Sequence, residues 1–218
     1  MPRKRSISDD RARQMLAQEA ARIIVDQGVR DYRAAKIKAA ERLGFNSRSS
    51  LPRNAEIERA VSEHLQLFGR ESHADFLRIM RQVAISAMEL LKSFAPRLVG
   101  PVLNGTADPN SAINLHVFAD SPELVAITLT DLGVSYRPYE RKLRSRRGTA
   151  ETFAGFQFVH EDASVEATVF PVDGIRQAPL SPINGKPMVR ADANAVGDLL
   201  EPVGGMFVEG SKAQRSEP

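Results

Sequence analysis

The residues whose types and spacing could do chemistry gather between positions 105 and 116. Gly105 and Thr106 lead into a turn-rich stretch that ends at Ser111. A glycine lets the backbone come close to a phosphate, to which backbone N–H groups and a threonine hydroxyl can donate hydrogen bonds. We therefore predict that Gly105, Thr106 and Ser111 bind a nucleotide or phosphate. An Asn-Gly pair is also common in plain turns between strands, and this alternative stays open.

The residues that follow predict a strand with polar side chains on one face. In the segment 113–118, apolar residues alternate with Asn114, His116 and Phe118, which is the period of a half-buried strand. Side chains two positions apart share a face of a strand, so Ala112, Asn114 and His116 are expected to face the glycine turn together. His116 is thus a candidate nucleotide or phosphate ligand. A packed, hydrogen-bonded histidine is the alternative.

A second candidate site is a cluster of basic residues between positions 137 and 147, where Glu140 is the only acid. Guanidinium groups pair with phosphate in a bidentate manner, so the cluster could bind RNA or another polyanion. The alternative is an edge strand whose charges prevent pairing with other strands. The predicted nucleic-acid-binding residues are Arg137, Arg141, Lys142, Arg144, Arg146 and Arg147.

Helices are expected to precede these residues and to support them. Apolar residues recur at helical spacing from residue 8 to about residue 94, with Gly28, Gly44 and Pro96 as stop signals. The second helix would carry basic residues such as Arg30 and Arg33 on its outer face, which is more typical of a solvated surface than of phosphate binding. The predicted helices are 8–28, 29–43, 54–68 and 72–94.

From residue 97 the pattern changes to strands alternating with helices. Residues 97–103 and 113–118 predict two strands around the glycine turn, and Ser121-Pro122 begins a helix that ends near Gly133. Pro138 marks 134–144 as an edge strand, and 153–160 with 164–172 predict a hairpin. The proline-rich segment 176–190 then leads to a last helix at 192–200. We predict an α+β fold, with an N-terminal helical region (1–71), a small mixed-sheet domain (72–200) and a flexible tail (201–218).

The strand, glycine turn and second strand resemble the nucleotidyltransferase superfamily, which has the polymerase-beta-like fold. In that family a strand ends in Gly-Ser, and the next strand carries two aspartates in a Ser-Asp-hydrophobic-Asp-Leu motif. Here Gly105-Thr106 stands at the first motif and residues 111–115 at the second. Ala112 and Asn114 replace the two aspartates. The resemblance covers about residues 72–200. It implies a domain that has kept the family's fold but lost its catalytic aspartates.

The resemblance also implies a role for Glu166, because the family places a third acidic ligand on a later strand. Glu166 shares a strand face with Ser164 and Thr168, while the apolar residues between them are expected to face the core. Asn114 and Glu166 are the catalytic candidates, and Glu166 is a weak candidate metal ligand. Phosphoryl transfer in this family uses two divalent cations, for which one carboxylate is a poor set of ligands. The alternative is a solvent-facing glutamate on an amphipathic strand.

Composition limits the remaining possibilities. The chain has 218 residues, a net charge of +3, a pI of 9.4 and no cysteine, which excludes disulfides and thiolate metal sites. Aromatic residues are 6% of the chain and tryptophan is absent, which argues against a broad base-stacking surface. No apolar run approaches the ~20 residues that span a bilayer. The basic start has no apolar segment behind it, so we expect a cytoplasmic protein without membrane contact.

Together these observations predict a noncatalytic protein that binds a nucleotide or nucleic acid, with no cofactor. One alternative is an active nucleotidyltransferase that uses Mg²⁺ to transfer a nucleoside monophosphate to RNA or protein. Another is a protein-interaction module, as in a toxin–antitoxin pair, for which exposed apolar residues on the N-terminal helices and a homo-oligomer or partner protein would be expected.

Overall fold

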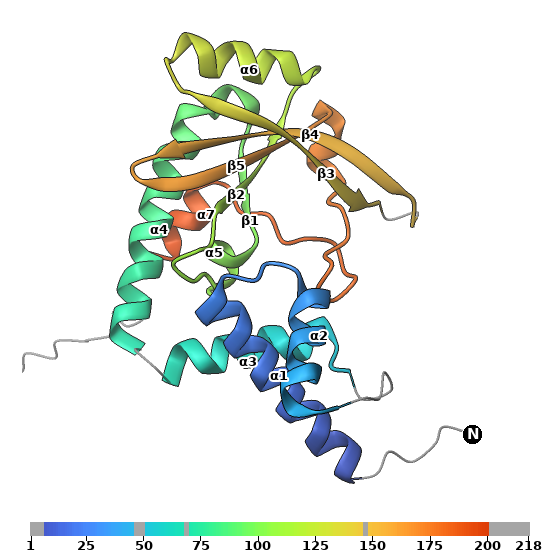
Figure 1. Cartoon of the computed structure of the whole chain (residues 1–218). Helices are drawn as coiled ribbons and strands as arrows, with labels where there is room; N and C mark the ends of the chain where they lie inside the picture. Colours follow the sequence, from blue (N-terminus) through green and yellow to red (C-terminus); the bar gives the residue numbers. More distant parts are fainter. Residues whose placement is uncertain (1–6, 46–50, 68–69, 146–147, 201–218) are drawn as a thin grey trace, which may run out of the picture.

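The chain places its first helices at one end and its sheet at the other (Figure 1). A computed structural model describes residues 7–45, 51–67, 70–145 and 148–200. The fold is α+β, as predicted. The helices are α1 (Ile7–Gln27), α2 (Tyr32–Leu43), α3 (Asn54–Leu67), α4 (Arg70–Leu90), α5 (Pro101–Asn104), α6 (Pro122–Asp131) and α7 (Ala193–Asp198), with 3-10 turns η2 (Lys92–Phe94) and η3 (Val172–Arg176). The strands are β1 (Arg97–Val99), β2 (Ile113–Phe118), β3 (Tyr136–Arg144), β4 (Ala150–His160) and β5 (Ala163–Phe170).

The strands form one mixed sheet in the order β1-β2-β5-β4-β3. β2 and β5 are parallel neighbours, and the other neighbouring pairs are antiparallel. The register of the parallel pair sets Asn114 beside Glu166 and His116 beside Thr168. The sequence motif and the later strand with its carboxylate are therefore adjacent in the centre of the sheet.

The two faces of the sheet differ in the way that strand alternation predicts. Alternate apolar residues of β2 and β5, such as Leu115 and Ala167, are fully buried in a core shared with α4 and α6. The opposite face carries Asn114, His116, Glu166 and the other polar side chains of these strands. Glu166 is only 9% exposed, so the interpretation of a solvent-facing glutamate is wrong.

The helices α1, α2 and α3 enclose a second hydrophobic cluster of their own. Leu16 and Ile23 of α1 pack there against Ala35 of α2 and Ile57 of α3, all of them fully buried. Gly44 ends α2 in the left-handed conformation (φ 69°), where its N–H donates to the last carbonyls of the helix. The first helices therefore have an apolar core separate from that of the sheet.

Several predicted boundaries are confirmed, but α2 begins at Tyr32 rather than at residue 29, and one predicted strand is wrong in part. β3 lies at the edge of the sheet and contains Pro138, and β4 and β5 form the predicted hairpin, with Glu161 and Asp162 at positive φ in its turn. The strand predicted over 97–103 is wrong in its second half. After β1, Pro101 sets the first position of the helical turn α5, which ends at Gly105 in the left-handed conformation (φ 80°). The predicted tail, 201–218, lies outside the described residues.

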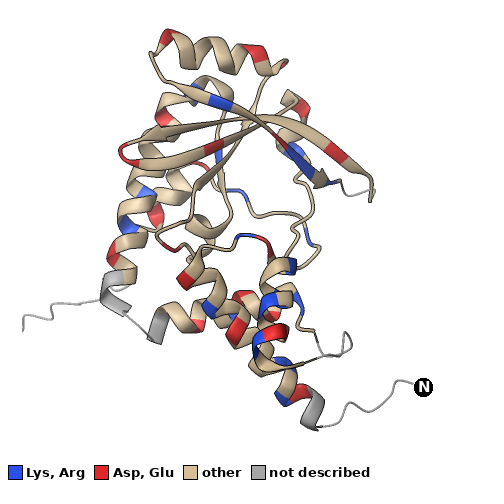
Figure 2. Cartoon of the chain, viewed as in Figure 1, with Lys and Arg blue, Asp and Glu red and all other residues tan. Residues whose placement is uncertain are grey.

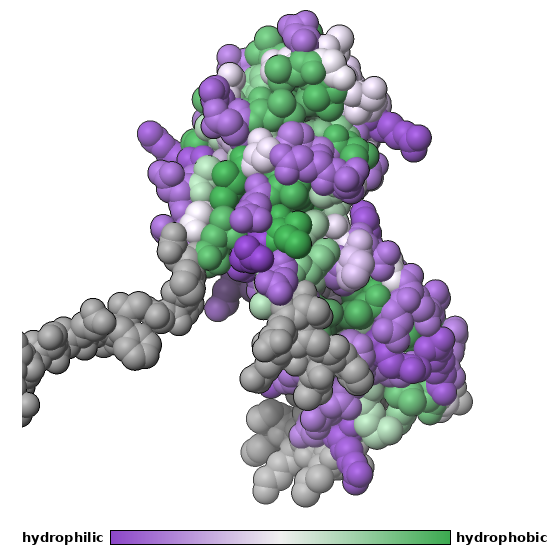
Figure 3. Space-filling model, turned by 90° about the vertical axis from the view of Figure 1, so that its left-hand side faces the viewer, coloured by the Kyte–Doolittle hydropathy of each residue, from purple (hydrophilic) through white to green (hydrophobic). Residues whose placement is uncertain are grey.

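The surface carries a group of apolar side chains on α6. This helix buries Val125 and Leu129 against the sheet, whereas Leu124, Ile127 and Leu132, the residue just after the helix, are between 45% and 56% exposed. Figure 3 shows apolar residues at the surface of this upper part of the molecule. Within the described residues, no helix is both long enough and apolar enough to cross a membrane.

Candidate functional site

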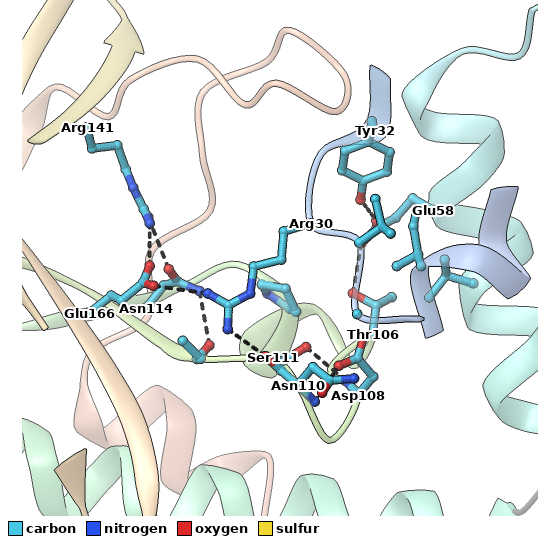
Figure 4. A pocket seen from close by; sticks show the side chains of 16 residues that line it. Arg30, Tyr32, Glu58, Thr106, Asp108, Asn110, Ser111, Asn114, Arg141 and Glu166 are labelled. Carbon is cyan, nitrogen blue, oxygen red and sulfur yellow. Dashed lines mark hydrogen bonds and ion pairs between the residues drawn. The ribbon is translucent and has the colours of Figure 1, made fainter. Parts of the chain in front are cut away.

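A cavity of about 240 Å³ lies between the N-terminal helices and the polar face of the sheet. Its walls come from five separate parts of the chain: the end of α1 through the start of α2, helix α3, the stretch from α5 to β2, strand β3 and strand β5. Figure 4 shows their polar side chains pointing toward one another. The polar and charged lining residues are Arg30, Tyr32, Glu58, Thr106, Asp108, Asn110, Ser111, Asn114, Arg141 and Glu166.

Glu166 is held by two arginines at one end of the cavity. Arg30 Nη1 lies 3.2 Å from Glu166 Oε1, and Arg141 Nη2 donates to Glu166 Oε2. The Glu166 side chain is 12% exposed, whereas those of Arg141 and Arg30 are 32% and 58% exposed. The carboxylate is therefore covered by guanidinium groups that themselves remain open to the cavity.

Arg141 reaches this position across the sheet from the edge strand β3. Its Nη1 donates to Asn114 Oδ1 over 3.0 Å, and its guanidinium lies 5.4 Å from the centre of the Tyr139 ring. Tyr139 in turn lies against Gly155 and forms a 2.8 Å hydrogen bond with Thr168. A Cβ on Gly155 would lie 2.3 Å from the Tyr139 ring, so only glycine leaves room for this arrangement.

Arg30 comes from the loop between α1 and α2. The loop begins at Gly28, which has φ +62° and lies so close to Asn110 that an added Cβ would be 3.1 Å from its side chain. Glycine alone adopts this conformation readily and permits the approach. Arg30 Nη2 then donates to the Asn110 carbonyl over 2.7 Å. The prediction that Arg30 lies on the outer face of the second helix is therefore wrong, because α2 begins only at Tyr32.

The other end of the cavity is acidic. Glu58 of α3 accepts hydrogen bonds from the Tyr32 hydroxyl and, over 2.8 Å, from Thr106 Oγ1. Burial and the nearby Glu58 carboxylate raise the pKa of Tyr32 above its ordinary value, so that its hydroxyl stays protonated and donates. Asp108 is also buried, and its Oδ1 accepts from the Asn110 N–H. A cationic end and an acidic end therefore face one cavity (Figure 4).

Gly105 and Thr106 do not form the predicted phosphate cradle. Both of their N–H groups donate to the Pro101 carbonyl and close the turn of α5, and the Thr106 hydroxyl donates to Glu58. Thr106 and Ser111 line the cavity, but Gly105 does not. The prediction fails because the strand before the glycine ends early and its place is taken by a helical turn, which uses these donors itself.

His116 also lies away from the cavity, although Ala112 and Asn114 line it as predicted. His116 is 1% exposed and accepts a 3.0 Å hydrogen bond at Nδ1 from Arg190 Nε, and its ring centre lies 4.4 Å from that of Phe170, with the rings tilted. Burial, then the positive charges of Arg190 and Arg141, lower its pKa to about 3. It is therefore the packed, neutral histidine of the alternative interpretation.

The predicted basic cluster is divided by the structure. Arg141 turns into the cavity, whereas Arg137, Lys142 and Arg144 are exposed on the edge strand. Arg146 and Arg147 lie outside the described residues. On the N-terminal helices acidic and basic residues are interspersed (Figure 2), and Arg42 of α2 is paired with Glu19 of α1. This pattern is that of a solvated surface.

Sequence reasoning missed Arg30, Tyr32, Glu58 and Asp108 as site residues. Their nearest signal was Gly28, a helix stop with an arginine two residues after it. The part that each plays depends on contacts between positions far apart in the chain, such as the 136 residues that separate Arg30 from Glu166.

The cavity does not fit the pair of divalent cations that the family resemblance implies. Ala112 offers no ligand, Asn114 Oδ1 accepts from Arg141, and both oxygens of Glu166 accept from arginines. Among the described residues, no group of three or more His, Asp or Glu side chains could hold a metal ion. Comparisons with protein-family models, curated proteins and solved structures found no match to this chain.

Proposed function

We propose that this protein is a noncatalytic, nucleotidyltransferase-like protein that binds a nucleotide in the cavity between its helical region and its sheet. The observation that carries the proposal is the convergence of Arg30 and Arg141 on Glu166. Two cations against one carboxylate leave an excess positive charge at this end, and a guanidinium group pairs well with phosphate.

The size and the polarity of the cavity support a nucleotide over a simple anion. Its volume of about 240 Å³ lies just below the range of about 300–1,000 Å³ for pockets that enclose drug-sized ligands, which suits a mononucleotide left partly in solvent. Glu58 and Asp108 offer hydrogen-bond acceptors at the other end. A ligand with a phosphate at one end and N–H or O–H donors at the other matches both ends.

The proposed relationship to nucleotidyltransferases draws support from the sheet register, in which Asn114 lies directly beside Glu166 on a parallel strand. The same register supports the absence of catalysis. At the places where the family holds carboxylates this chain has Ala112, Asn114 and a Glu166 that is paired with arginines. Charge on a transferring phosphoryl group would have no metal ion to balance it there.

Calorimetric titration of the four nucleoside monophosphates and triphosphates tests the binding proposal. We expect micromolar to millimolar binding of at least one nucleotide, and at least a tenfold loss of affinity in Arg141→Ala, which is about 1.4 kcal/mol. Arg137→Ala, a change at an exposed arginine of the same strand, is the matched control and should bind normally. Equal affinity in both variants would contradict binding in this cavity.

The absence of catalysis has its own test. The protein is incubated with α-labelled nucleoside triphosphates, Mg²⁺ or Mn²⁺ and total RNA, beside a Glu166→Ala variant. We expect no incorporation of label into RNA or into the protein. Incorporation that is lost in Glu166→Ala would make the chain an active, metal-dependent transferase.

Nucleic acid is a second candidate ligand, favoured by the exposed side chains of Lys142 and Arg144 on one face of the edge strand. Binding through such groups depends on released counterions and weakens steeply with salt. A fluorescent RNA oligomer that binds the wild type and loses affinity in a Lys142→Ala, Arg144→Ala double variant would support it. Equal binding by this double variant would count against it.

A further inference from the structure

We infer that the cavity holds the phosphate of its ligand without a divalent cation, and that Glu166 is the internal counter-ion of Arg30 and Arg141 rather than a metal ligand. The inference rests on the proposed function and adds to it the means by which the phosphate is held. It also gives Glu166 a role opposite to the one that the family resemblance implies.

Each arginine is anchored by a second acceptor in addition to Glu166. Arg30 donates to the Asn110 carbonyl over 2.7 Å, and Arg141 donates to Asn114 Oδ1 over 3.0 Å. These anchors fix the directions of both guanidinium groups and would persist if Glu166 lost its charge. A guanidinium has five N–H donors, so each arginine keeps further donors beyond the two contacts described for it.

The charges and the exposure at Glu166 favour an anion over a dication. A Mg²⁺ ion would have to share each carboxylate oxygen that it used with a guanidinium, and would lie beside two positive groups that repel it. A phosphate is instead attracted by these two positive groups, because the arginine side chains are more exposed than the carboxylate that they cover. The ligand that approaches from the cavity therefore meets guanidinium groups first.

Glu166 and a bound phosphate compete for the same donors. Without ligand, the carboxylate offsets part of the charge of the two arginines and holds their side chains together at the end of the cavity. With ligand, the phosphate takes part of that role, and the negative charge of Glu166 repels it. Removing this charge while keeping the shape should thus strengthen phosphate binding, whereas removing a metal ligand should weaken it. The opposite signs separate the two roles.

The experiment is a calorimetric titration of the wild type and Glu166→Gln with inorganic phosphate and with the nucleotide that binds best, once in EDTA and once in Mg²⁺. We expect the wild type to bind the nucleotide in EDTA and Mg²⁺ to add nothing. Glu166→Gln should bind about tenfold more tightly than the wild type, as expected when a competing charge is removed from a partly buried site. Glu140→Gln, a change at an exposed carboxylate of β3, is the matched control and should leave the affinity unchanged.

Each other outcome has a definite meaning. Nucleotide binding that requires Mg²⁺ and is lost in Glu166→Gln would overturn this inference while leaving the proposed function intact. Binding by the wild type in neither buffer would overturn the proposed function and the inference with it. Should Glu166→Gln fail to fold, as judged by circular dichroism, the metal dependence of the wild type and of Arg30→Lys decides between the two roles. Arg30→Lys keeps the charge but not the planar donor group, and should bind more weakly in EDTA.

Discussion

The same face of β2 meets arginines at two places with different consequences. Asn114 meets Arg141, which pairs with a carboxylate and borders a cavity. His116, the next residue on that face, meets Arg190, which has no carboxylate partner among the described residues. Arg190 instead donates to the carbonyls of Gly174 and Ile175.

Arg190 is packed in a way that suits structure rather than binding. Its guanidinium lies 5.0 Å from the ring centres of both Phe118 and Phe170. Burial, then the nearby charge of Arg97, lowers its pKa to about 10, so it remains charged at neutral pH. Its Nε and Nη1 donate to neutral acceptors and its guanidinium lies on aromatic faces, whereas Nη2 is buried without a hydrogen-bond partner in the described residues. The comparison teaches that arginines on one strand face can serve stability or binding, according to whether a cavity opens beside them.

Replacing Arg190 should have the largest effect on stability. Arg190→Ala would remove the hydrogen bonds to His116, Gly174 and Ile175 together with the contacts to two aromatic rings. We expect a loss of about 3 kcal/mol in the free energy of unfolding, with little direct effect on nucleotide affinity. Urea unfolding followed by circular dichroism measures it. A loss under about 1 kcal/mol would mean that this arginine is not the structural one of the pair.

The buried His116 predicts a pH dependence of stability. Its pKa is about 3 in the folded chain and about 6.5 as an ordinary histidine, so between these values the unfolded chain binds the extra proton. Stability should therefore fall as the pH is lowered from about 6.5 towards 3, by up to about 1.4 kcal/mol for each pH unit. His116→Gln keeps an acceptor for Arg190 but does not titrate. Its stability should change less than that of the wild type between pH 6 and pH 4, and parallel curves would refute the assignment.

Replacing Arg141 should affect binding more than stability. Arg141→Ala leaves Glu166 paired with Arg30, so we expect a loss of only about 1–2 kcal/mol in the free energy of unfolding. Nucleotide affinity should fall at least tenfold, as set out above. The two variants should then differ in which quantity they lower: Arg190→Ala lowers mainly the free energy of unfolding, and Arg141→Ala lowers mainly the nucleotide affinity. Similar losses of stability and of nucleotide affinity in both variants would contradict this distinction between the two arginines.

The smallest effect is expected at the exposed end of the basic cluster. Lys142→Ala changes a side chain that is exposed and outside the cavity, so the free energy of unfolding should change by less than about 0.5 kcal/mol. Nucleotide affinity should also stay within the error of calorimetry. A marked loss of affinity in this variant would extend the site from the cavity onto the edge strand.

Local patterns predicted much of the fold because they depend on neighbouring residues. The alternation in β2 and β5 identified the core face of the sheet, Pro138 identified its edge strand, and Gly44 identified the end of α2. Strand alternation made Asn114 a candidate for the site, the basic cluster added Arg141, and the family resemblance added Glu166, and all three line the cavity. The local pattern gave a wrong prediction after Val99, where the chain forms the helical turn α5 instead of continuing the strand. Gly105 therefore ends that turn and does not line the cavity.

The sequence by itself determined the α+β fold and the strand faces, because the periods of strands and helices are written in consecutive residues. Only the tertiary structure decided that Arg30 meets Glu166 and that Arg190 covers His116. These pairs are joined by the packing of separate elements, 136 and 74 residues apart in the chain. The sequence around a glutamate does not show whether its carboxylate faces a metal ion or an arginine. The role of Glu166 therefore depends on which side chain the fold brings beside it.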